Sequence, residues 1–517
     1  MEGKKSKEAC QQDRRTGGPT LLKTKEGSVH AISDNLISIP TKKRKCPSTS
    51  TNSRSLLHRR LTSRFVAQPN KMASTTQVQI LPIAEFKPAA ASRAWVSIPN
   101  PNGLPLIATA TSDKTVRVYS LRNFTLHSTL EGGHSRSVRS VAWQPAVKNT
   151  GTLCIATGSF DATMGIWRRR EERFADVEEK EIHTEPAGDD DALEVEIAGD
   201  GKAKSAPSIQ NEDSDNDDDW EFAIVLEGHD SEIKNVAFSP SGQWLASCSR
   251  DKSIWIWEDI GDEGDDEYET VAVLQEHTAD VKCVCWRKDD GNGEILASGS
   301  YDDTIRFFKG DDEGEWSCIS TLEGHEGTVW SLDWEPEVSQ KQFYAEPESP
   351  EAASPEKDHS PRIPRLISSS ADCTVRVWSK VPSPPPPNKP SYFNSGIPST
   401  MRPPPADETW ECTATLPTAH DLPIYSVSWS KKSGRVVSTG GDGKIVVYEE
   451  RTKGRTSVGG AIEREWEIVG VLAGGHGPYE INHVTWCTRF DPGKTEEGEE
   501  MIVTTGDDGV ARAWTLS

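Results

Sequence analysis

A turn aspartate with an aromatic residue six positions later occurs seven times in this chain of 517 residues, and this repetition constrains the fold more than any other feature. The seven pairs are Asp113/Tyr119, Asp161/Trp167, Asp251/Trp257, Asp302/Phe308, Asp372/Trp378, Asp442/Tyr448 and Asp508/Trp514. A histidine precedes each of the last six pairs and has its own aromatic residue nine or ten positions later. These second pairs are His134/Trp143, His229/Phe238, His277/Trp286, His325/Trp334, His420/Trp429 and His476/Trp486. One unit recurring at such spacing predicts a repeat architecture.

Each repeat also contains four short apolar or β-branched runs separated by polar turns, which predict strands. In the third repeat we expect these strands at 233–238, 245–249, 253–257 and 270–274. Four strands with one Asp-to-aromatic turn resemble the WD40 repeat, whose period is about 40 to 45 residues. The resemblance begins near residue 75 and implies an all-β, seven-bladed WD40 β-propeller. A strand at 77–85 is expected to complete the last blade and so remove the open edge of the ring.

The predicted domains are a disordered basic extension at 1–72 and a propeller at 73–517. The blades are expected to end near Tyr119, Trp167, Trp257, Phe308, Trp378, Tyr448 and Trp514.

The WD40 resemblance implies a hydrogen-bonded network of His, Ser or Thr, Asp and Trp within each complete blade. The four complete sets are His134 with Thr157, Asp161 and Trp167; His229 with Ser247, Asp251 and Trp257; His325 with Ser368, Asp372 and Trp378; and His476 with Thr504, Asp508 and Trp514. In three blades Tyr119, Phe308 and Tyr448 replace the Trp, and the first blade also lacks the His. Buried Asp and His side chains are tolerable only when their polar atoms are paired. Because these residues recur in blade after blade, whereas a catalytic site occurs once per domain, we expect them to be structural and the protein not to be an enzyme.

The charge of the chain is divided unevenly. Its 58 Lys+Arg and 81 Asp+Glu give a net charge of −23, which argues against a surface for nucleic acid or anionic membrane. Residues 1–72 hold 16 basic and 5 acidic residues, a net of +11, so the remainder carries 42 − 76 = −34. The basic run 42–45 predicts either a nuclear localisation signal or a solvated tail without an address. Since neither a long apolar run nor a secretory signal is present, we expect a soluble protein of the cytoplasm, and also of the nucleus.

The ten cysteines are too sparse for a disulfide framework, and none forms a C-x-x-C pair. Cys283 and Cys285 form the one close pair and are expected to pack in the interior rather than to bind a metal. The sequence therefore predicts no metal site and no resident cofactor.

The long insertions all follow the first or the third strand of a repeat, and both of these loops lie on the bottom face of a propeller. They are the acidic segment 171–219, the Ser-Pro-rich segment 336–364, the Pro-rich segment 380–409, and the shorter segments 450–464 and 488–499. The long ones are expected to be disordered loops. Because loops tolerate insertion only where nothing docks, the short top loops predict that partners bind the top face.

The residue before each turn Asp and the start of each innermost strand should line the top face and the mouth of the channel. The predicted partner-binding residues are Phe160, Arg250, Tyr301, Arg139, Lys234, Lys282, Trp330 and Tyr425. Arginine with aromatic residues is typical of interface hot spots. The four cations predict a positive island on the acidic body, which would suit an acidic segment or a C-terminal carboxylate.

Several stretches resemble one WD40 family more closely, the cytosolic iron–sulfur protein assembly propeller of the targeting complex. They are 249–258 (SRDKSIWIWE), 300–308 (SYDDTIRFF), 322–330 (LEGHEGTVW) and 273–277 (VLQEH). The resemblance implies that Arg250 is a functional surface residue. It also implies a scaffold that binds a MIP18-type protein, a HEAT-repeat targeting subunit, an iron-only-hydrogenase-like cluster carrier and apo iron–sulfur client proteins. The basic extension and the long inserts depart from the compact family pattern.

Two other classes of function stay open. A substrate receptor of a cullin ubiquitin ligase should show Trp-Asp-x-Arg after a blade, but the segment 167–170 (WRRR) keeps the final Arg and lacks the Asp. A propeller that reads histones or other peptides would use the basic extension as its nuclear address. The identity of the bound proteins would discriminate between these alternatives.

Overall fold

A computed structural model of the protein describes residues 78–145, 152–170, 220–261, 267–289, 293–311, 314–336, 364–381, 408–455 and 462–517, with only the backbone at 454–455 and 462–463. The chain divides into the units Met1–Met72 and Ala73–Ser517. The predicted extension 1–72 and insert 171–219 lie outside the described residues. So do the predicted inserts 336–364 and 380–409, apart from a few residues at their ends.

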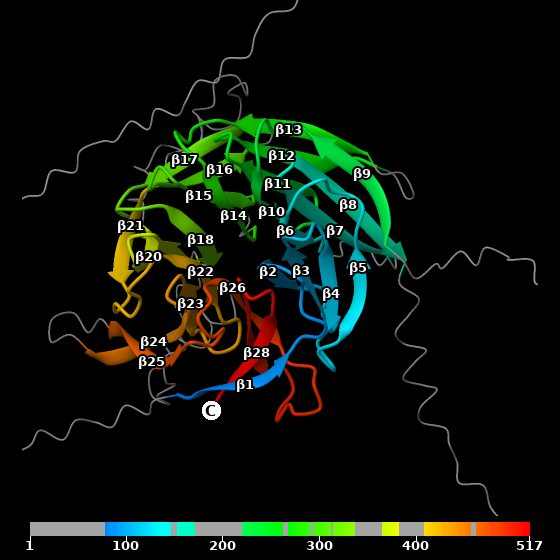
Figure 1. The fold of residues 1–517 in the computed structure, drawn as a ribbon. Helices are drawn as coiled ribbons and strands as arrows, with labels where there is room; N and C mark the ends of the chain where they lie inside the picture. Colours follow the sequence, from blue (N-terminus) through cyan, green and yellow to red (C-terminus); the bar gives the residue numbers. More distant parts are fainter. Residues whose placement is uncertain are drawn as a thin grey trace, which may run out of the picture. The chain divides into compact units, whose positions relative to one another are not determined.

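The unit Ala73–Ser517 is built from seven four-stranded antiparallel sheets arranged as blades around an axis (Figure 1). Blades one to three are β2 (Ala94–Pro99), β3 (Leu106–Thr111), β4 (Val116–Ser120) and β5 (Leu126–Leu130); β6 (Val138–Trp143), β7 (Thr152–Ser159), β8 (Thr163–Arg170) and β9 (Glu221–Glu227); β10 (Ile233–Phe238), β11 (Trp244–Ser249), β12 (Ile254–Asp259) and β13 (Tyr268–Leu274). Blades four and five are β14 (Val281–Arg287), β15 (Ile295–Ser300), β16 (Ile305–Gly310) and β17 (Trp316–Leu322); β18 (Val329–Trp334), β19 (Leu366–Ser370), β20 (Val375–Lys380) and β21 (Trp410–Thr415). Blades six and seven are β22 (Ile424–Trp429), β23 (Val436–Gly440), β24 (Lys444–Arg455) and β25 (Ile462–Ala473); β26 (Ile481–Thr488), β27 (Glu500–Gly506), β28 (Ala511–Leu516) and β1 (Ile80–Glu85).

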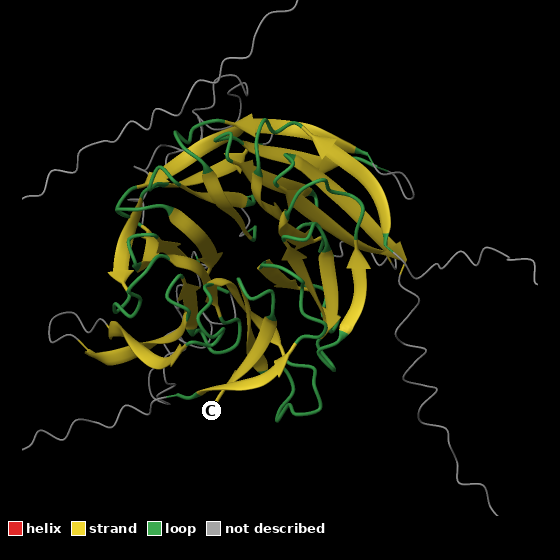
Figure 2. Cartoon of the chain, in the orientation of Figure 1, coloured by secondary structure: helices red, strands yellow, loops and turns green. Residues whose placement is uncertain are grey.

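The prediction of an all-β, seven-bladed propeller is therefore confirmed. Figure 2 shows only strands and loops in the described part, which holds no helix long and apolar enough to cross a membrane. The first strand closes the ring, because β1 pairs antiparallel with β28 from Ile80↔Leu516 to Glu85↔Arg512. The sheet of blade seven thus joins the two ends of the propeller unit, as expected from the apolar run at 77–85.

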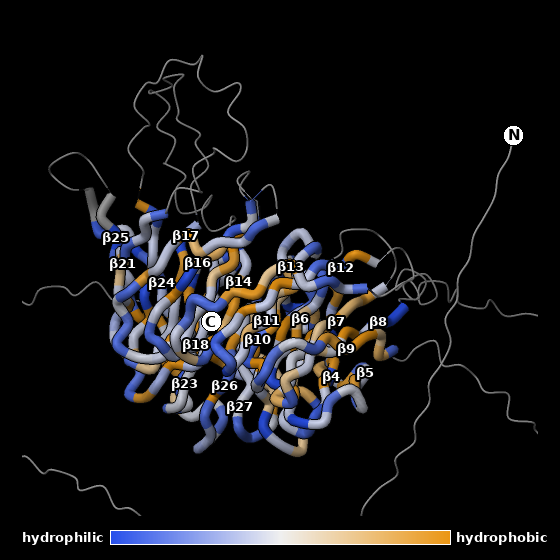
Figure 3. The backbone as a smooth tube through the Cα atoms, turned by 90° about the horizontal axis from the view of Figure 1, so that it is seen from above, coloured by the Kyte–Doolittle hydropathy of each residue, from blue (hydrophilic) through white to orange (hydrophobic). Residues whose placement is uncertain are grey.

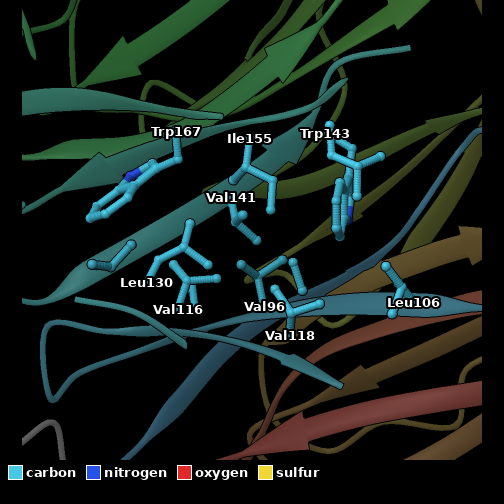
Figure 4. Close-up of a cluster of buried hydrophobic side chains, with 13 residues drawn as sticks. Val96, Leu106, Val116, Val118, Leu130, Val141, Trp143, Ile155 and Trp167 are labelled. Atoms are coloured by element: carbon cyan, nitrogen blue, oxygen red, sulfur yellow. The ribbon is translucent and has the colours of Figure 1, made fainter. Parts of the chain in front are cut away.

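Apolar side chains fill the spaces between neighbouring blades. In Figure 4, Val96 and Val116 of blade one lie against Val141 and Ile155 of blade two. Figure 3 shows apolar residues running along the strands, while the turns are mostly hydrophilic. This packing places the innermost strands of all seven blades around one axis, where successive inner strands contact each other.

Tryptophan is abundant because it occupies several repeating positions. In four blades a Trp of the innermost strand meets a Trp at or near the beginning of the outermost strand, with ring centroids 5.7 to 6.0 Å apart. These pairs are Trp143/Trp220, Trp286/Trp316, Trp334/Trp410 and Trp429/Trp466. The edge-to-face geometry spans the breadth of a blade and gives the outer strand a fixed position on the inner ones.

The segment 450–464 is largely not the loop insertion expected from the sequence. Strands β24 and β25 continue into it as a long hairpin, paired as far as Arg455↔Ile462. Ion pairs cross the hairpin, with Arg451 Nη1 3.1 Å from Glu467 and Lys453 Nζ 2.8 Å from Glu465. Opposite charges on facing strands stabilise such a ribbon, which explains why a charged sequence forms strands here.

A buried ion network joins blades five and six near the bottom face. Arg365 donates to Glu335 on its own blade and to Glu450 on β24, with Nη2 2.9 Å from each carboxylate. The guanidinium also lies 5.2 Å from the ring centre of Trp429. The two stems from which the Ser-Pro-rich insert and the long hairpin leave the propeller are therefore held together by one cation.

Candidate functional site

The turn networks underlie the top face. In the third blade His229 Nδ1 lies 2.8 Å from Asp251, its Nε2 lies 2.8 Å from Ser247 Oγ, and Trp257 Nε1 donates to the same hydroxyl at 3.1 Å. The Asp also accepts the backbone N–H of Asp230. Every polar group of this set has a partner, so the turn that carries Arg250 rests on a rigid base.

The three other complete sets have the same geometry. Their His-to-Asp, His-to-hydroxyl and Trp-to-hydroxyl distances lie between 2.7 and 3.3 Å. They consist of His134 with Thr157, Asp161 and Trp167; His325 with Ser368, Asp372 and Trp378; and His476 with Thr504, Asp508 and Trp514. In blade seven the network extends outward, because Arg512 contacts both Asp508 and Glu85 of the closing strand.

The hydroxyl groups at the centre of these sets are not accessible to a partner. Thr157, Ser368 and Thr504 are completely buried, as is Ser247 in the third blade. Thr157 lies 2.8 Å from His134 Nε2, Ser368 lies 2.7 Å from His325 Nε2, and Thr504 lies 2.8 Å from His476 Nε2. These residues therefore lie outside the candidate binding surface and support its turns from inside the blades.

Incomplete blades keep part of the network. His277 bonds to Asp302 and Ser298 at 2.9 and 2.7 Å, while Phe308 is buried without a polar contribution. In the first blade, which has no His, Asp113 instead accepts from Thr111, Thr115 and Arg117. Burial tends to raise the pKa of Asp113, but these hydrogen bonds and the Arg charge outweigh it and lower the pKa.

Seven equivalent positions, the second residue of each innermost strand, surround the channel at its top end. In blade order they are Trp95, Arg139, Lys234, Lys282, Trp330, Tyr425 and Asn482. Cations thus occupy three consecutive blades, and aromatic residues stand on either side of them. The sequence predicted five of these residues but missed Trp95 and Asn482, because blade one lacks the His that marks the start of an inner strand and blade seven has an extra residue there.

The cations around this mouth contact aromatic rings. Arg93 and Arg139 lie 4.6 and 4.9 Å from the ring centre of Trp95. Lys234 Nζ lies 4.6 Å from the ring centre of Phe160, on the turn of blade two. Such contacts hold both partners in place and leave their outer edges available to a ligand.

On the next blades Lys282 Nζ lies 5.5 Å from the ring centre of Tyr301 and 5.3 Å from that of Trp330. Trp330 in turn meets Tyr425 with ring centroids 5.3 Å apart. Burial raises the pKa of Tyr425 to about 12, so its phenol stays protonated at neutral pH. The structure therefore brings seven of the eight predicted partner-binding residues into one ladder around the channel mouth.

Arg250, the eighth, stands apart from this ladder. Its side chain is 59% exposed, and its Nη1 lies 3.6 Å from Glu232. Glu232 also accepts a hydrogen bond from Lys234 at 2.8 Å and pairs with Arg136 at 3.5 Å. The hydrogen bond from Lys234 lowers the pKa of Glu232, and the charges of the three cations lower it further, while burial tends to raise it. A lowered pKa is expected for one carboxylate that is shared by three cations.

The expected positive island is consequently weaker than the sequence indicated. Lys282 also has a carboxylate partner, Asp280, at 3.1 Å. Both Glu232 and Asp280 lie two residues before the lysine that they neutralise, on the loop that leads into the inner strand. Of the four cations predicted to form the island, only Arg139 keeps an uncompensated charge, since no described residue forms a hydrogen bond or ion pair with it.

The cysteine pair on β14 differs in burial. Cys283 is buried, whereas Cys285 is half-buried, and both line the channel. Burial raises the pKa of both thiols, so they remain protonated at neutral pH. Within the described ranges all eight cysteines are free, and no group of three or more His, Cys, Asp or Glu residues is arranged to hold a metal ion.

Comparison with known sequences agrees with the blade geometry. The family model described as WD domain, G-beta repeat matches residues 124–168, 220–258, 268–309, 316–340, 352–379 and 410–449. These matches cover the Asp-to-aromatic turns of blades two to six.

Three curated relatives extend the similarity over most of the chain, and each is named probable cytosolic iron-sulfur protein assembly protein 1. The one from Botryotinia fuckeliana is 68% identical over 437 residues, covering 84% of this chain and 96% of the relative. That from Sclerotinia sclerotiorum is 65% identical over 462 residues, covering 86% of this chain and 98% of the relative. A more distant one, from Neurospora crassa, is 40% identical over 508 residues and covers 88% and 99% of the two chains.

Proposed function

Because this chain belongs to the cytosolic iron-sulfur protein assembly protein 1 family of WD40 propellers, we propose that it serves iron–sulfur protein assembly as a scaffold whose top face binds other proteins. The iron–sulfur cluster is the cargo of this process, delivered into client proteins. A propeller suits such a task, since its rigid blades can hold several proteins at once on different surfaces.

One observation supports our proposal that Arg250 is a partner-binding residue of the top face. Its guanidinium is exposed on a turn whose next residue, Asp251, is fixed in the network with His229. A charged group held at a defined position on a rigid turn can pair with a carboxylate at little cost in conformational entropy. Phe160 and Tyr301 occupy the equivalent turns of the two neighbouring blades and can supply apolar contacts beside it.

The partners that we propose are a MIP18-type protein, a HEAT-repeat targeting subunit, an iron-only-hydrogenase-like cluster carrier and apo iron–sulfur clients. The ladder residues Arg139, Lys234, Lys282, Trp330 and Tyr425 would enlarge the surface toward the channel. We further place the protein in the cytoplasm and, through the basic run 42–45, in the nucleus. That run lies outside the described residues, and its role is tested by the distribution of the full chain with these four residues changed to Ala.

Affinity purification of the full chain tests the proposal, with wild type beside Arg250→Glu and bound proteins identified by mass spectrometry. Lys252→Glu is a matched control, because Lys252 is an exposed cation in the same turn whose side chain forms no hydrogen bond or ion pair with a described residue. We expect wild type and the control to recover the MIP18-type and HEAT-repeat proteins, and Arg250→Glu to lose them. Recovery of ligase adaptors or histones in their place would contradict the proposed scaffold.

A further inference from the structure

The axial channel holds a cavity of about 320 Å³ whose lining is positively charged. Inner strands of the blades form its wall, from Asn482 and Tyr425 at the top end to Trp143 and Phe238 further along those strands. Three cationic side chains, Arg139, Lys234 and Lys282, belong to this lining, and no carboxylate does. A narrow cavity with charges of one sign in its wall concentrates ions of the opposite sign.

Arg139 is the cation of this wall that the protein leaves without a counterion. Lys234 and Lys282 are held by Glu232 and Asp280, which lie outside the lining. The guanidinium of Arg139 lies instead over the face of Trp95 and has no hydrogen-bond or ion-pair partner among the described residues. Burial and the like charge of Arg93 lower the pKa of Arg139 to about 10, yet it stays protonated at neutral pH. A protonated, half-buried guanidinium is costly unless an anion accepts its hydrogen bonds.

Trp330 and His483 belong to the same lining and bring no negative charge to it. The indole Nε1 of Trp330 is buried and has no hydrogen-bond partner among the described residues. His483 completes the nearby wall as a neutral ring, because burial and the charge of Arg139 lower its pKa to about 3. The cavity therefore presents the unpaired guanidinium of Arg139 in a lining that contains no carboxylate.

We propose that the axial channel binds a small free oxyanion, a phosphate or the carboxylate of a small molecule, with Arg139 as its principal ligand. The planar guanidinium presents paired N–H groups that match two oxygens of such an ion. Lys234 and Lys282 contribute less, because their ammonium groups already have carboxylate partners. The size of the cavity and its enclosure by the inner strands favour a small ion over a polypeptide segment.

Calorimetric titration of the full chain with inorganic phosphate tests the site, using sodium chloride at matched ionic strength as the reference. We expect saturable binding of one phosphate per chain. Arg139→Met should lower the affinity tenfold or more, as loss of a charge-assisted hydrogen bond does. Parallel titrations with acetate and succinate distinguish a carboxylate ligand from phosphate.

Arg136→Met is the matched control, because Arg136 lies on the same face and three residues from Arg139 but outside the cavity lining. It should bind phosphate like wild type. Should Arg139→Met fail to fold, Arg139→Lys keeps the charge without the paired donors and should still weaken binding. Absence of saturable binding for phosphate and for both carboxylates would overturn the proposal, and so would unchanged affinity in the folded Arg139 variant. The outcome is independent of protein capture through Arg250, which the purification experiment measures separately.

Discussion

The carboxylate of Asp251 lies 2.8 Å from Nδ1 of His229, beneath the turn on which the preceding residue, Arg250, projects into solvent. Two adjacent residues thus serve opposite purposes, since one fixes the turn and the other is presented by it. Their substitutions should separate folding from binding.

Replacing Asp251 with Ala should lower the free energy of unfolding by about 1 to 3 kcal/mol, because His229 and the backbone N–H groups of the turn lose a buried acceptor. Urea unfolding followed by tryptophan fluorescence measures this change. Asp230→Ala is the control, since the side chain of Asp230 is exposed and only its backbone contacts the network. Equal stability of the two variants would contradict the assigned role of Asp251.

Arg250→Glu should instead leave the free energy of unfolding within about 0.5 kcal/mol of wild type, as surface substitutions usually do. It should nevertheless reduce protein capture, because the new carboxylate would repel both Glu232 and an acidic partner. The same urea titration, run beside the purification experiment, gives both quantities. A collapse of stability together with binding would make Arg250 a structural residue.

The pH dependence of stability should reveal the network of blade seven. Burial raises the pKa of Asp508, but hydrogen bonds from His476 and Arg512 outweigh this effect and lower the pKa to about 2. An unfolded Asp has a pKa of about 3.9. Because the folded value is the lower one, the stabilisation is complete above about pH 4 and is lost as the pH falls toward 2.

The difference in unfolding free energy between wild type and Asp508→Asn should therefore narrow as the pH falls from about 4 to about 2. Urea titrations at several pH values measure this gap. If the difference in unfolding free energy stayed constant across this pH range, the ionised carboxylate of Asp508 could not be the source of the stabilisation. Asp230→Asn, which alters an exposed carboxylate, should show no such trend.

The closing strand supplies a fourth prediction, because two adjacent residues of β1 differ in burial. Ile80 is 7% exposed and packs with Val437 and Ile445 of blade six, whereas Leu81 is 40% exposed. Ile80→Ala should cost about 2 to 5 kcal/mol of unfolding free energy, the usual range for a buried large-to-small change. Leu81→Ala should cost far less, and similar losses for both would mean that closure does not depend on this packing.

The fold was predictable because its signals are local and repeated. Each Asp-to-aromatic turn is specified within seven residues, and seven copies reinforce one another. The neutralisation of Lys234 by Glu232 was missed because the positive island was inferred from the cations alone, although residues two apart along an extended chain point to the same side. Trp95 was missed for a related reason: the first blade lacks the His from which the inner strands were counted.

The long hairpin of blade six shows a different limit of sequence reasoning. Its charged residues read as a solvated insert when taken along the chain, because Arg451 and Lys453 offer no apolar face. Their partners, Glu467 and Glu465, come after the turn and become visible only once the two strands are paired. The charges of this hairpin are thus neutralised only when its two strands pair. The residue pattern of one strand alone does not indicate such pairing.

The ion network between blades five and six gives the last prediction. Arg365→Met should destabilise the protein by about 3 to 5 kcal/mol, because it leaves Glu335 and Glu450 buried without their shared cation. Arg451→Met is the matched control, since Arg451 is a more exposed cation whose ion pairs should contribute less than about 1 kcal/mol. Adding Glu335→Gln to Arg365→Met should restore part of the loss by removing one unpaired charge. If the double variant were less stable than Arg365→Met alone, the cost would lie in packing against Trp429 rather than in an uncompensated carboxylate.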